Sequence, residues 1–306
     1  MTTQREDLYS KITGTIVTQL EAGVRPWHQP WSAAHAAGGI SRPLRYNGQP
    51  YNGVNVLVLW LAAFQRGYSC PLWLTFQQAK ELGGHVKKGE KGTMVVYANT
   101  FEKKEKDEET GEETTERIPF LKSYVVFNAA EQTEGLPGHY YARAVAPRNL
   151  ADRLEHAEQF FANTKADTRH GGNKAFYSPS GDFIQLPPFD SFENRDSYYA
   201  TRSHESIHWT KHEQRLNRSF DSKRFGDDGY AMEELTAELG AAFLCADLGI
   251  TPEMMPEHAS YLDAWLKVLK ADKRAIFTAA SHASKAAEYL HSLQPNAKPE
   301  EPVATE

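Results

Sequence analysis

Apolar residues recur at intervals of four at the start of the chain. Leu8, Ile12, Ile16 and Leu20 would share one face of a helix that stops near Gly23. Two more helices are predicted in this half of the chain: an apolar one within NGVNVLVLWLAAFQRGY, closed near its final glycine, and a short one over residues 73–84. The sequence therefore predicts three helices within the first 84 residues.

An alternating pattern then replaces the helical one. The lysine-rich turn VKKGEKG leads into the alternating strand TMVVYANTF, and residues 118–127 supply a partner strand. Between them, residues 101–117 hold 4 basic and 8 acidic residues and almost no apolar ones, which predicts an exposed hairpin tip or a mobile loop. Residues 1–137 thus form an α+β domain with a small antiparallel sheet.

The second half is richer in helices. A connector over residues 138–149 is expected to lead into a domain spanning residues 150–293, and residues 294–306 have the Pro/Glu composition of a disordered tail. The expected elements are a helix over 150–164, a hairpin turning at Ser180-Gly181, a helix that carries HESIH, and helices over 257–270 and 272–293. Between these, residues 230–249 form a helix whose apolar stripe is Leu235, Leu239, Ala242, Phe243 and Ala246.

HESIH, residues 204–208, is the motif with the clearest chemistry. His204 and His208 lie one helical turn apart on the same face, where both can bind one metal ion, Zn²⁺ or another divalent ion such as Mn²⁺. Glu205 is placed to act as a general base toward a water at that ion. The alternative is an ordinary helix with two solvent-facing histidines.

A catalytic zinc site needs a third protein ligand. His212 is unsuitable, because on a straight helix it lies roughly 12 Å along the axis from His204. The helix over 230–249 offers acids at the border of its buried face, notably Glu234 and Glu238. On the residues alone, these acids could also belong to a solvated helix face.

The two motifs together resemble the gluzincin group of metallopeptidases. The resemblance implies Glu234 as the third ligand and Glu238 as the acid that orients a histidine ring; because Glu238 stands where aspartate is common, Glu238 could itself be the ligand, and Glu233 is a further choice. Tyr230 is a candidate hydrogen-bond donor to the developing oxyanion. Tyr198 and Tyr199 are either core or cleft residues, and the hairpin is the candidate edge strand for binding an extended peptide.

The first domain has features that suit single-stranded nucleic acid. Without residues 101–117, residues 1–150 carry 13 basic and 7 acidic side chains, although the whole chain has a net charge of −6. Aromatic rings that lie near arginines could stack on bases, and lysines in a glycine-rich loop could follow phosphates. The candidates for DNA binding are Trp27, Trp31, Arg45, Tyr46, Tyr51, Trp73, Lys87, Lys88 and Lys91. The alternative is that these rings are core residues and that the lysine turn is a plain solvated hairpin.

Composition indicates in which cellular compartment the protein is expected. Only Cys70 and Cys245 are present, so no disulfide framework is expected. The N-terminus lacks the apolar segment of a signal peptide, and the longest apolar run is about half of a membrane span. We expect a cytoplasmic protein with no membrane partner.

Several segments of the first domain resemble the ArdC-type antirestriction proteins: PWHQPW, RYNGQPYNGVNVLVLWL, GYSCPLWLTFQQAKELGGHVKKGEKGTMVVY and VFNAAEQTEGLP. The resemblance covers nearly the whole chain, since that family also ends in a zincin-like domain with HExxH. It implies a domain that binds single-stranded DNA joined to a metallopeptidase domain, with protection of incoming plasmid DNA from host restriction as the role. The implied partners are single-stranded DNA and a protein substrate, such as a component of a restriction system. A second hypothesis keeps only DNA coating, with a metal site that is structural or idle.

Overall fold

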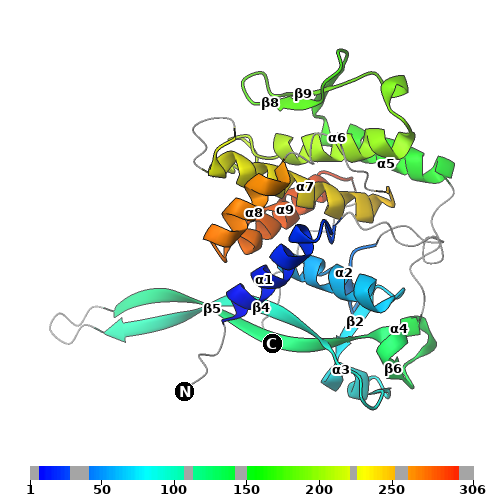
Figure 1. The fold of residues 1–306 in the computed structure, drawn as a ribbon, viewed down its shortest axis with the longest axis vertical. Helices are drawn as coiled ribbons and strands as arrows, with labels where there is room; N and C mark the ends of the chain where they lie inside the picture. The colour runs from blue at the N-terminus through cyan, green and yellow to red at the C-terminus, as the bar shows by residue number, and fades with distance from the viewer. Residues whose placement is uncertain are drawn as a thin grey trace.

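The structure is a computed structural model that describes residues 7–27, 41–106, 113–141, 150–220, 226–251 and 261–295. It has the α+β architecture expected from the sequence, with helices stacked above a twisted sheet (Figure 1). No helix in these ranges is both long enough and apolar enough to cross a membrane. The connector residues 142–149 and the tail residues 296–306 lie outside the described ranges, so the expected domain boundaries stay predictions.

The N-terminal helices follow the apolar pattern closely. Helix α1 (Leu8–Glu21) buries Ile12, Ile16 and Leu20, and Asp7 caps its first turn by accepting a hydrogen bond from the Ser10 backbone N–H. Helix α2 (Val54–Arg66) ends at Gly67, whose φ of 70° is the left-handed conformation that glycine adopts at little cost. Both predicted helices are therefore present where the sequence placed them.

The short predicted helix over residues 73–84 is partly wrong. Its first residues belong to strand β2 (Leu72–Thr75), and helix α3 (Phe76–Glu81) starts only after Thr75. Thr75 and Gln78 form a reciprocal capping box that fixes this start. Strand β2 pairs with the sheet on both sides, and this tertiary pairing outweighs the local helical pattern.

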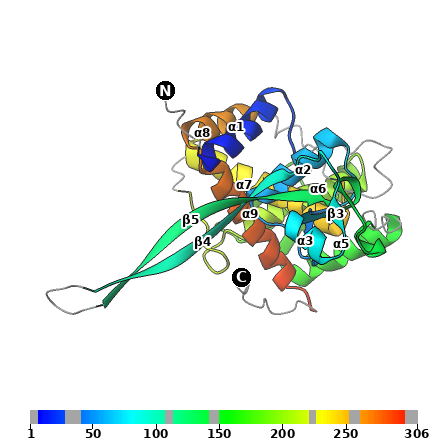
Figure 2. The same ribbon diagram turned by 90° about the horizontal axis from the view of Figure 1, so that it is seen from below.

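The main sheet has the strand order β1-β2-β5-β4, from β1 (Leu44–Arg45), β2, β4 (Thr93–Lys106) and β5 (Glu113–Asn128). All of its pairings are antiparallel except that of β1 with β2. Strands β4 and β5 remain paired as far as Lys106 and Glu113, so much of the acidic segment is strand rather than loop. The hairpin extends well beyond the body of the molecule (Figures 1 and 2). Residues 107–112 lie outside the described ranges. Smaller elements complete this half: β3 (His85–Val86), α4 (Ala129–Gln132), β6 (Thr133–Glu134) and the 3-10 helix η1 (Gly138–Tyr141).

The C-terminal half contains the expected helices and hairpin, together with one strand that the sequence did not indicate. Its elements are α5 (Leu150–Thr164), β7 (Asp167–His170), β8 (Phe176–Ser178), β9 (Phe183–Leu186), η2 (Phe189–Ser191), α6 (Arg195–Trp209), α7 (Asp228–Leu248), α8 (Leu262–Ala271) and α9 (Ala275–Ser292). Strands β8 and β9 form the predicted hairpin, and β7 pairs in parallel with the far side of β9. This three-stranded sheet packs against α6.

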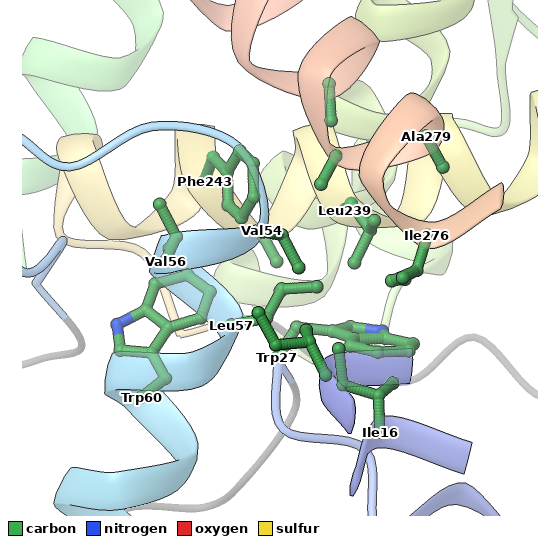
Figure 3. Close-up of a cluster of buried hydrophobic side chains, with 14 of the residues drawn as sticks. Ile16, Trp27, Val54, Val56, Leu57, Trp60, Leu239, Phe243, Ile276 and Ala279 are labelled. Atoms are coloured by element: carbon green, nitrogen blue, oxygen red, sulfur yellow. The ribbon is translucent and has the colours of Figure 1, made fainter. Parts of the chain in front are cut away.

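The largest hydrophobic cluster joins the two halves of the chain. It contains residues of α1 and α2 together with residues of α7, α8 and α9. Figure 3 shows Trp27 and Ile16 beside Ile276, and Val54 and Phe243 in the same cluster. Polar contacts cross the same boundary: Thr13 donates to the Lys273 carbonyl, at 2.6 Å. The two halves of the chain therefore share the largest cluster, called the shared core below.

Helix α7 lies at the centre of this arrangement (Figure 1). Leu235, Leu239 and Phe243 face the N-terminal helices in the shared core, as the predicted stripe implies. Ala237, Leu244 and Cys245 belong to a second cluster with α5, α6 and the small sheet. A helix that is buried on both sides can present side chains to α6 and to the N-terminal half at once.

Candidate metal centre

Helix α6 carries both histidines of the motif. Its N-cap is Asn194, whose side chain accepts a hydrogen bond from the Ser197 backbone N–H, and it continues to Trp209. Residues His204, Glu205 and His208 are 4%, 4% and 7% exposed. The motif therefore faces the interior, which rules out the alternative of two solvent-facing histidines.

Helix α7 approaches α6 closely at one position. A Cβ atom on Gly240 would lie 2.9 Å from Cδ1 and Cγ1 of Ile207, nearer than real Cβ contacts. Glycine at this position lets the two helices come together at Ile207, the residue just before His208 in α6. This close contact places Glu234 of α7 against the histidine rings of α6.

Three donor groups converge between the two helices. The Nε2 atoms of His204 and His208 are 3.1 Å apart. The two carboxylate oxygens of Glu234 face one ring each, at 3.5 Å from His204 Nε2 and 3.6 Å from His208 Nε2. Among the described residues, these three form a group whose ligand atoms all lie within 4.8 Å of one another.

These separations fit a shared metal ion. Two ligand atoms that each lie about 2.1 Å from a tetrahedral zinc ion are about 3.4 Å apart. The separations of the Glu234 oxygens and the imidazole nitrogens lie within a few tenths of an ångström of that value. The donor set, two imidazoles and one carboxylate, is also one that catalytic zinc sites use.

The acid that orients His208 is Glu233. The Nδ1 atom of His208 donates to Glu233 Oε1 at 2.9 Å, and Arg218 donates to both oxygens of Glu233, also at 2.9 Å. Arg218 is itself held by the Ile207 carbonyl and the Thr210 hydroxyl. Glu233 is the weakest of the three acid candidates from the sequence, and nothing in the spacing of the motif indicates Arg218.

Glu238 lies beside the other histidine. Its Oε2 atom is 3.8 Å from His204 Nδ1, which is close enough for electrostatic attraction but longer than a hydrogen bond. That Glu238 orients a histidine ring stays a prediction, with His204 as the neighbouring ring, and the carboxylate hydrogen-bonded to His208 is that of Glu233. Glu238 is 2% exposed and does not belong to the group of converging donors.

Burial disfavours the charged forms of the histidines and glutamates in the centre, and their mutual attraction opposes this effect. Burial alone would lower the pKa of His208, but Glu234 and the hydrogen-bonded Glu233 raise that pKa to about 10. Burial would likewise raise the pKa of Glu233, but hydrogen bonds from His208 and Arg218 hold it at about 2. The pKa of Glu234 is held below its ordinary range, against burial, by the two histidines. Carboxylates that compensate an imidazolium in this position can equally compensate a divalent cation.

The tyrosines named from the sequence divide into two groups. Tyr198 and Tyr199 are core residues, since both are buried and their hydroxyl groups pair with His170 and Glu158, each at 2.9 Å. Tyr230 is near the centre: burial raises its pKa, as do a hydrogen bond with Tyr261 and the charge of Glu234. Its phenol therefore keeps its proton at neutral pH and can donate a hydrogen bond.

Most of the aromatic residues predicted to stack on DNA are inside the protein. Trp27 and Trp73 are each 1% exposed and Tyr51 is 3% exposed, because all three fill the shared core. They cannot offer a ring face to a base, so these three assignments are corrected. Trp31 lies outside the described residues.

The remaining DNA candidates have different surroundings. Tyr46 is 39% exposed, and the Arg45 guanidinium lies over the Tyr51 ring at 5.5 Å. The Lys87 ammonium donates to the Glu131 carbonyl at 2.9 Å, which ties that lysine to the protein. Lys88 and Lys91 are exposed and remain candidates for phosphate contacts.

A row of aromatic and cationic side chains on the long hairpin was not identified from the sequence. Tyr124, Lys122 and Phe120 alternate along β5, and the register places Lys122 opposite Tyr97. Tyr97 and Tyr124 are 39% and 36% exposed, and Lys122 lies over the Phe120 ring at 5.1 Å. The period-two spacing puts these side chains on one face of the sheet, and that spacing was the available signal.

Two segments of the chain match families of known proteins. Residues 6–127 match the N-terminal domain of anti-restriction factor ArdC, and residues 155–282 match a zincin-like metallopeptidase family. The crystal structure of the antirestriction protein ArdC from plasmid R388, in its metal-free form, is 45% identical and covers 94% of this chain and 98% of that one, with a TM-score of 0.78. The chain belongs to the ArdC antirestriction family. The Mn(II)-bound structure of the R388 protein matches with a TM-score of 0.77 and 42% identity, over 96% of this chain and all of that one.

Other relatives show where this unit occurs. Uncharacterized protein y4eC of Sinorhizobium fredii is 39% identical over 97% of both chains. DNA primase TraC of Escherichia coli is 34% identical over 95% of this chain, but the match covers only 27% of the primase. The same unit is thus part of a much longer protein in that relative.

Proposed function

We propose that this protein protects incoming plasmid DNA from host restriction, using an N-terminal region that binds single-stranded DNA and a metal-dependent peptidase centre. The convergence of His204, His208 and Glu234 between two helices, with Glu205 next to the first ligand, carries the peptidase part of the proposal. A purely structural metal site has no need of a general base, so the presence of Glu205 favours catalysis. The family membership supports the antirestriction role.

The three donors would hold a divalent ion, Zn²⁺ or Mn²⁺. When bound there, such an ion supplies Lewis acidity, which makes a water more acidic and polarises the scissile carbonyl. Glu205 takes the proton of the attacking water and passes it to the leaving amine. Glu233 and Arg218 hold the His208 ring in place, and Tyr230 donates a hydrogen bond to the carbonyl oxygen. The Mn(II)-bound structure of the R388 protein supports the choice of a divalent metal.

Two substitutions test the centre. Glu205→Gln is expected to bind Mn²⁺ or Zn²⁺ with wild-type stoichiometry and to lower peptide hydrolysis by about 10²–10⁴-fold, because the general base is lost. His204→Ala is expected to lose the metal, because only two ligands remain. Metal content after dialysis, measured by mass spectrometry, checks both expectations. Stoichiometric metal in His204→Ala protein would refute the site.

The second candidate is a protein that protects DNA by coating single strands, with an idle metal site. The exposed rings of the hairpin favour DNA contact under either candidate. Transfer of an unmodified plasmid into a restricting host separates the two when the plasmid encodes the Glu205→Gln protein. Peptidase action predicts loss of protection, whereas full protection would favour coating.

For the DNA contacts we propose the hairpin row Tyr97, Phe120, Lys122 and Tyr124 in place of the buried tryptophans. Stacking of one base on one ring contributes about 1–3 kcal/mol. Tyr97→Ala and Tyr124→Ala should therefore each weaken binding of a single-stranded oligonucleotide by about fivefold to 150-fold. Fluorescence anisotropy measures this, with Phe176→Ala as the control, since Phe176 is 43% exposed on β8 of the C-terminal half. Unchanged affinity in both tyrosine variants would exclude the row as the interface.

A further inference from the structure

Arg25 brings a charge from the N-terminal half into the neighbourhood of the metal centre. It follows α1 in the chain and is only 8% exposed. Its Nη1 atom lies 3.9 Å from Oε1 of Glu238, an acid of α7 that is 2% exposed. The contact joins residues 213 positions apart in the chain (238 minus 25), so only the tertiary fold creates it.

Glu238 connects this arginine to a proposed ligand. Its Oε1 atom faces Arg25, while its Oε2 atom lies 3.8 Å from Nδ1 of His204. The opposite nitrogen of that ring, Nε2, is the one that points toward Glu234 and His208. A fixed Glu238 carboxylate would therefore fix the direction in which His204 presents Nε2.

We propose that Arg25 is a positioning residue of the metal centre, which acts through Glu238 on His204. The N-terminal half thus completes a site whose proposed ligands all come from the C-terminal half. This inference rests on the proposed metal site but goes beyond it, because it makes metal affinity depend on a residue outside the matched metallopeptidase segment, residues 155–282.

Electrostatics explains why such a partner is needed. A carboxylate that is removed from water is costly unless a positive group compensates it, and breaking one side of a buried pair leaves an uncompensated charge. Arginine suits this role, because it stays charged at all relevant pH values and is less strongly hydrated than lysine. Without the guanidinium, the Glu238 side chain is expected to leave its present position, and the His204 ring would lose the group beside Nδ1.

The surroundings hold Arg25 in place. Its guanidinium lies over the Trp265 ring at 5.5 Å. Trp265 also meets the edge of Trp27, with ring centroids 6.2 Å apart, and Trp27 is fixed in the shared core (Figure 3). Gly23, with a φ of 75°, turns the chain out of α1 just before Arg25. The position of the guanidinium is therefore set by the packing between the two halves.

Arg42 provides a matched control. It is another buried arginine from the N-terminal half, 4% exposed, and it lies over an aromatic ring of α7, Phe243, at 5.6 Å. It also pairs with an acid of the C-terminal half, Asp247, at 2.8 Å. Its partner, however, hydrogen-bonds His291 rather than lying next to a proposed metal ligand. Replacing Arg42 removes the same kind of packing and charge without touching His204.

The test compares Arg25→Met, Arg25→Lys and Arg42→Met in the full-length protein. Mn²⁺ and Zn²⁺ dissociation constants are measured by isothermal titration calorimetry, and Co²⁺ absorption spectra report the geometry of the ligands. Arg25→Met should weaken metal binding by about 10–100-fold, as loss of a group that orients a ligand does elsewhere. Arg25→Lys should recover part of that loss, and Arg42→Met should leave the affinity unchanged within about twofold, since distant sites act independently.

Two results would contradict the proposed role of Arg25. Wild-type affinity and an unchanged Co²⁺ spectrum in folded Arg25→Met protein would overturn the inference, as would equal losses in Arg25→Met and Arg42→Met. If Arg25→Met fails to fold, Arg25→Lys serves instead, and wild-type affinity together with an unshifted Co²⁺ spectrum would overturn the proposal. If the wild-type protein itself binds no metal, the proposed metal site is wrong. That result differs from a wild-type protein that binds metal and an Arg25 variant with unchanged affinity, which would contradict only the role of Arg25.

Discussion

Neighbouring acids on α7 contact opposite sides of one imidazole. Glu234 faces His208 Nε2 at 3.6 Å, while Glu233 accepts a hydrogen bond from His208 Nδ1 at 2.9 Å. Adjacent helix positions point about 100° apart, and the two side chains accordingly meet different nitrogens of the ring. Glu234 is thus the proposed ligand and Glu233 the acid hydrogen-bonded to the ring, whereas the resemblance to the gluzincins had implied Glu238 as the orienting acid.

Glu233→Gln should weaken metal binding without removing it. The substitution replaces the carboxylate beside His208 Nδ1 with an amide and leaves Arg218 without its charged partner. A loss in metal affinity of about 10–100-fold is expected, together with a clear loss of stability from the uncompensated guanidinium. Calorimetric titration with Mn²⁺ and thermal unfolding measure the two effects, with exposed Glu213→Gln as the control. Unaltered affinity would mean that Glu233 has no part in orienting the ring.

The pair of helices α6 and α7 forms the element on which the centre depends. Their close approach at Gly240 and Ile207 brings the acids of one helix within reach of the histidines of the other. The apolar stripe of α7 was predicted correctly, but its position between two clusters was not, because a periodic stripe reports only one buried face. From the sequence, a glycine within a helical pattern indicates only a lower helix propensity. The structure shows that Gly240 leaves room for the Ile207 side chain of α6.

Gly240→Ala is expected to disturb the centre from a distance. Alanine gains up to about 1 kcal/mol of helix propensity over glycine, but overpacking costs about 1–3 kcal/mol, since the new Cβ meets three atoms of the β-branched Ile207 side chain. The net result should be lower stability and weaker metal binding, with partial rescue by a second substitution, Ile207→Ala. Urea unfolding and metal titration are the measurements.

Gly14→Ala in α1 is the control for this substitution. A Cβ atom at Gly14 would meet nothing within 4 Å, so the variant gains helix propensity without overpacking. It should be slightly more stable than the wild type and bind metal equally well. A Gly240→Ala protein that behaved in the same way would show that the close helix contact does not govern the centre.

At the scale of the whole molecule, the two halves are joined by a core rather than by a linker alone. Trp27, far from the C-terminal helices in sequence, packs against Trp265 of α8 and belongs to the same cluster as Ile276 of α9. Domain boundaries drawn from the sequence follow the order of motifs along the chain, so they do not show that residues from both halves pack into one cluster. Because of this shared core, we expect the two halves to unfold cooperatively.

Trp27→Ala tests this cooperation. It should lower the free energy of unfolding by about 3–5 kcal/mol and speed amide hydrogen exchange in α8 and α9 as well as in α1. Leu74→Ala is the comparison, because Leu74 is fully buried in a separate cluster made of N-terminal residues alone. Its effect on exchange should stay in the N-terminal half at low denaturant. Confinement of the Trp27→Ala effect to α1 and α2 would show that the halves are independent.

The sequence by itself determined most of the helices, the paired strands of both hairpins and the pair of histidines in α6. Local periodicity encodes which residues share a face, and the spacing of His204 and His208 by one turn depends on helix geometry alone. The tertiary structure decided which acid meets which histidine, that Trp27 and Trp73 are core residues, and that Arg25 reaches Glu238. These outcomes depend on contacts between segments far apart in the chain, and no local pattern records how a folded core brings such segments together.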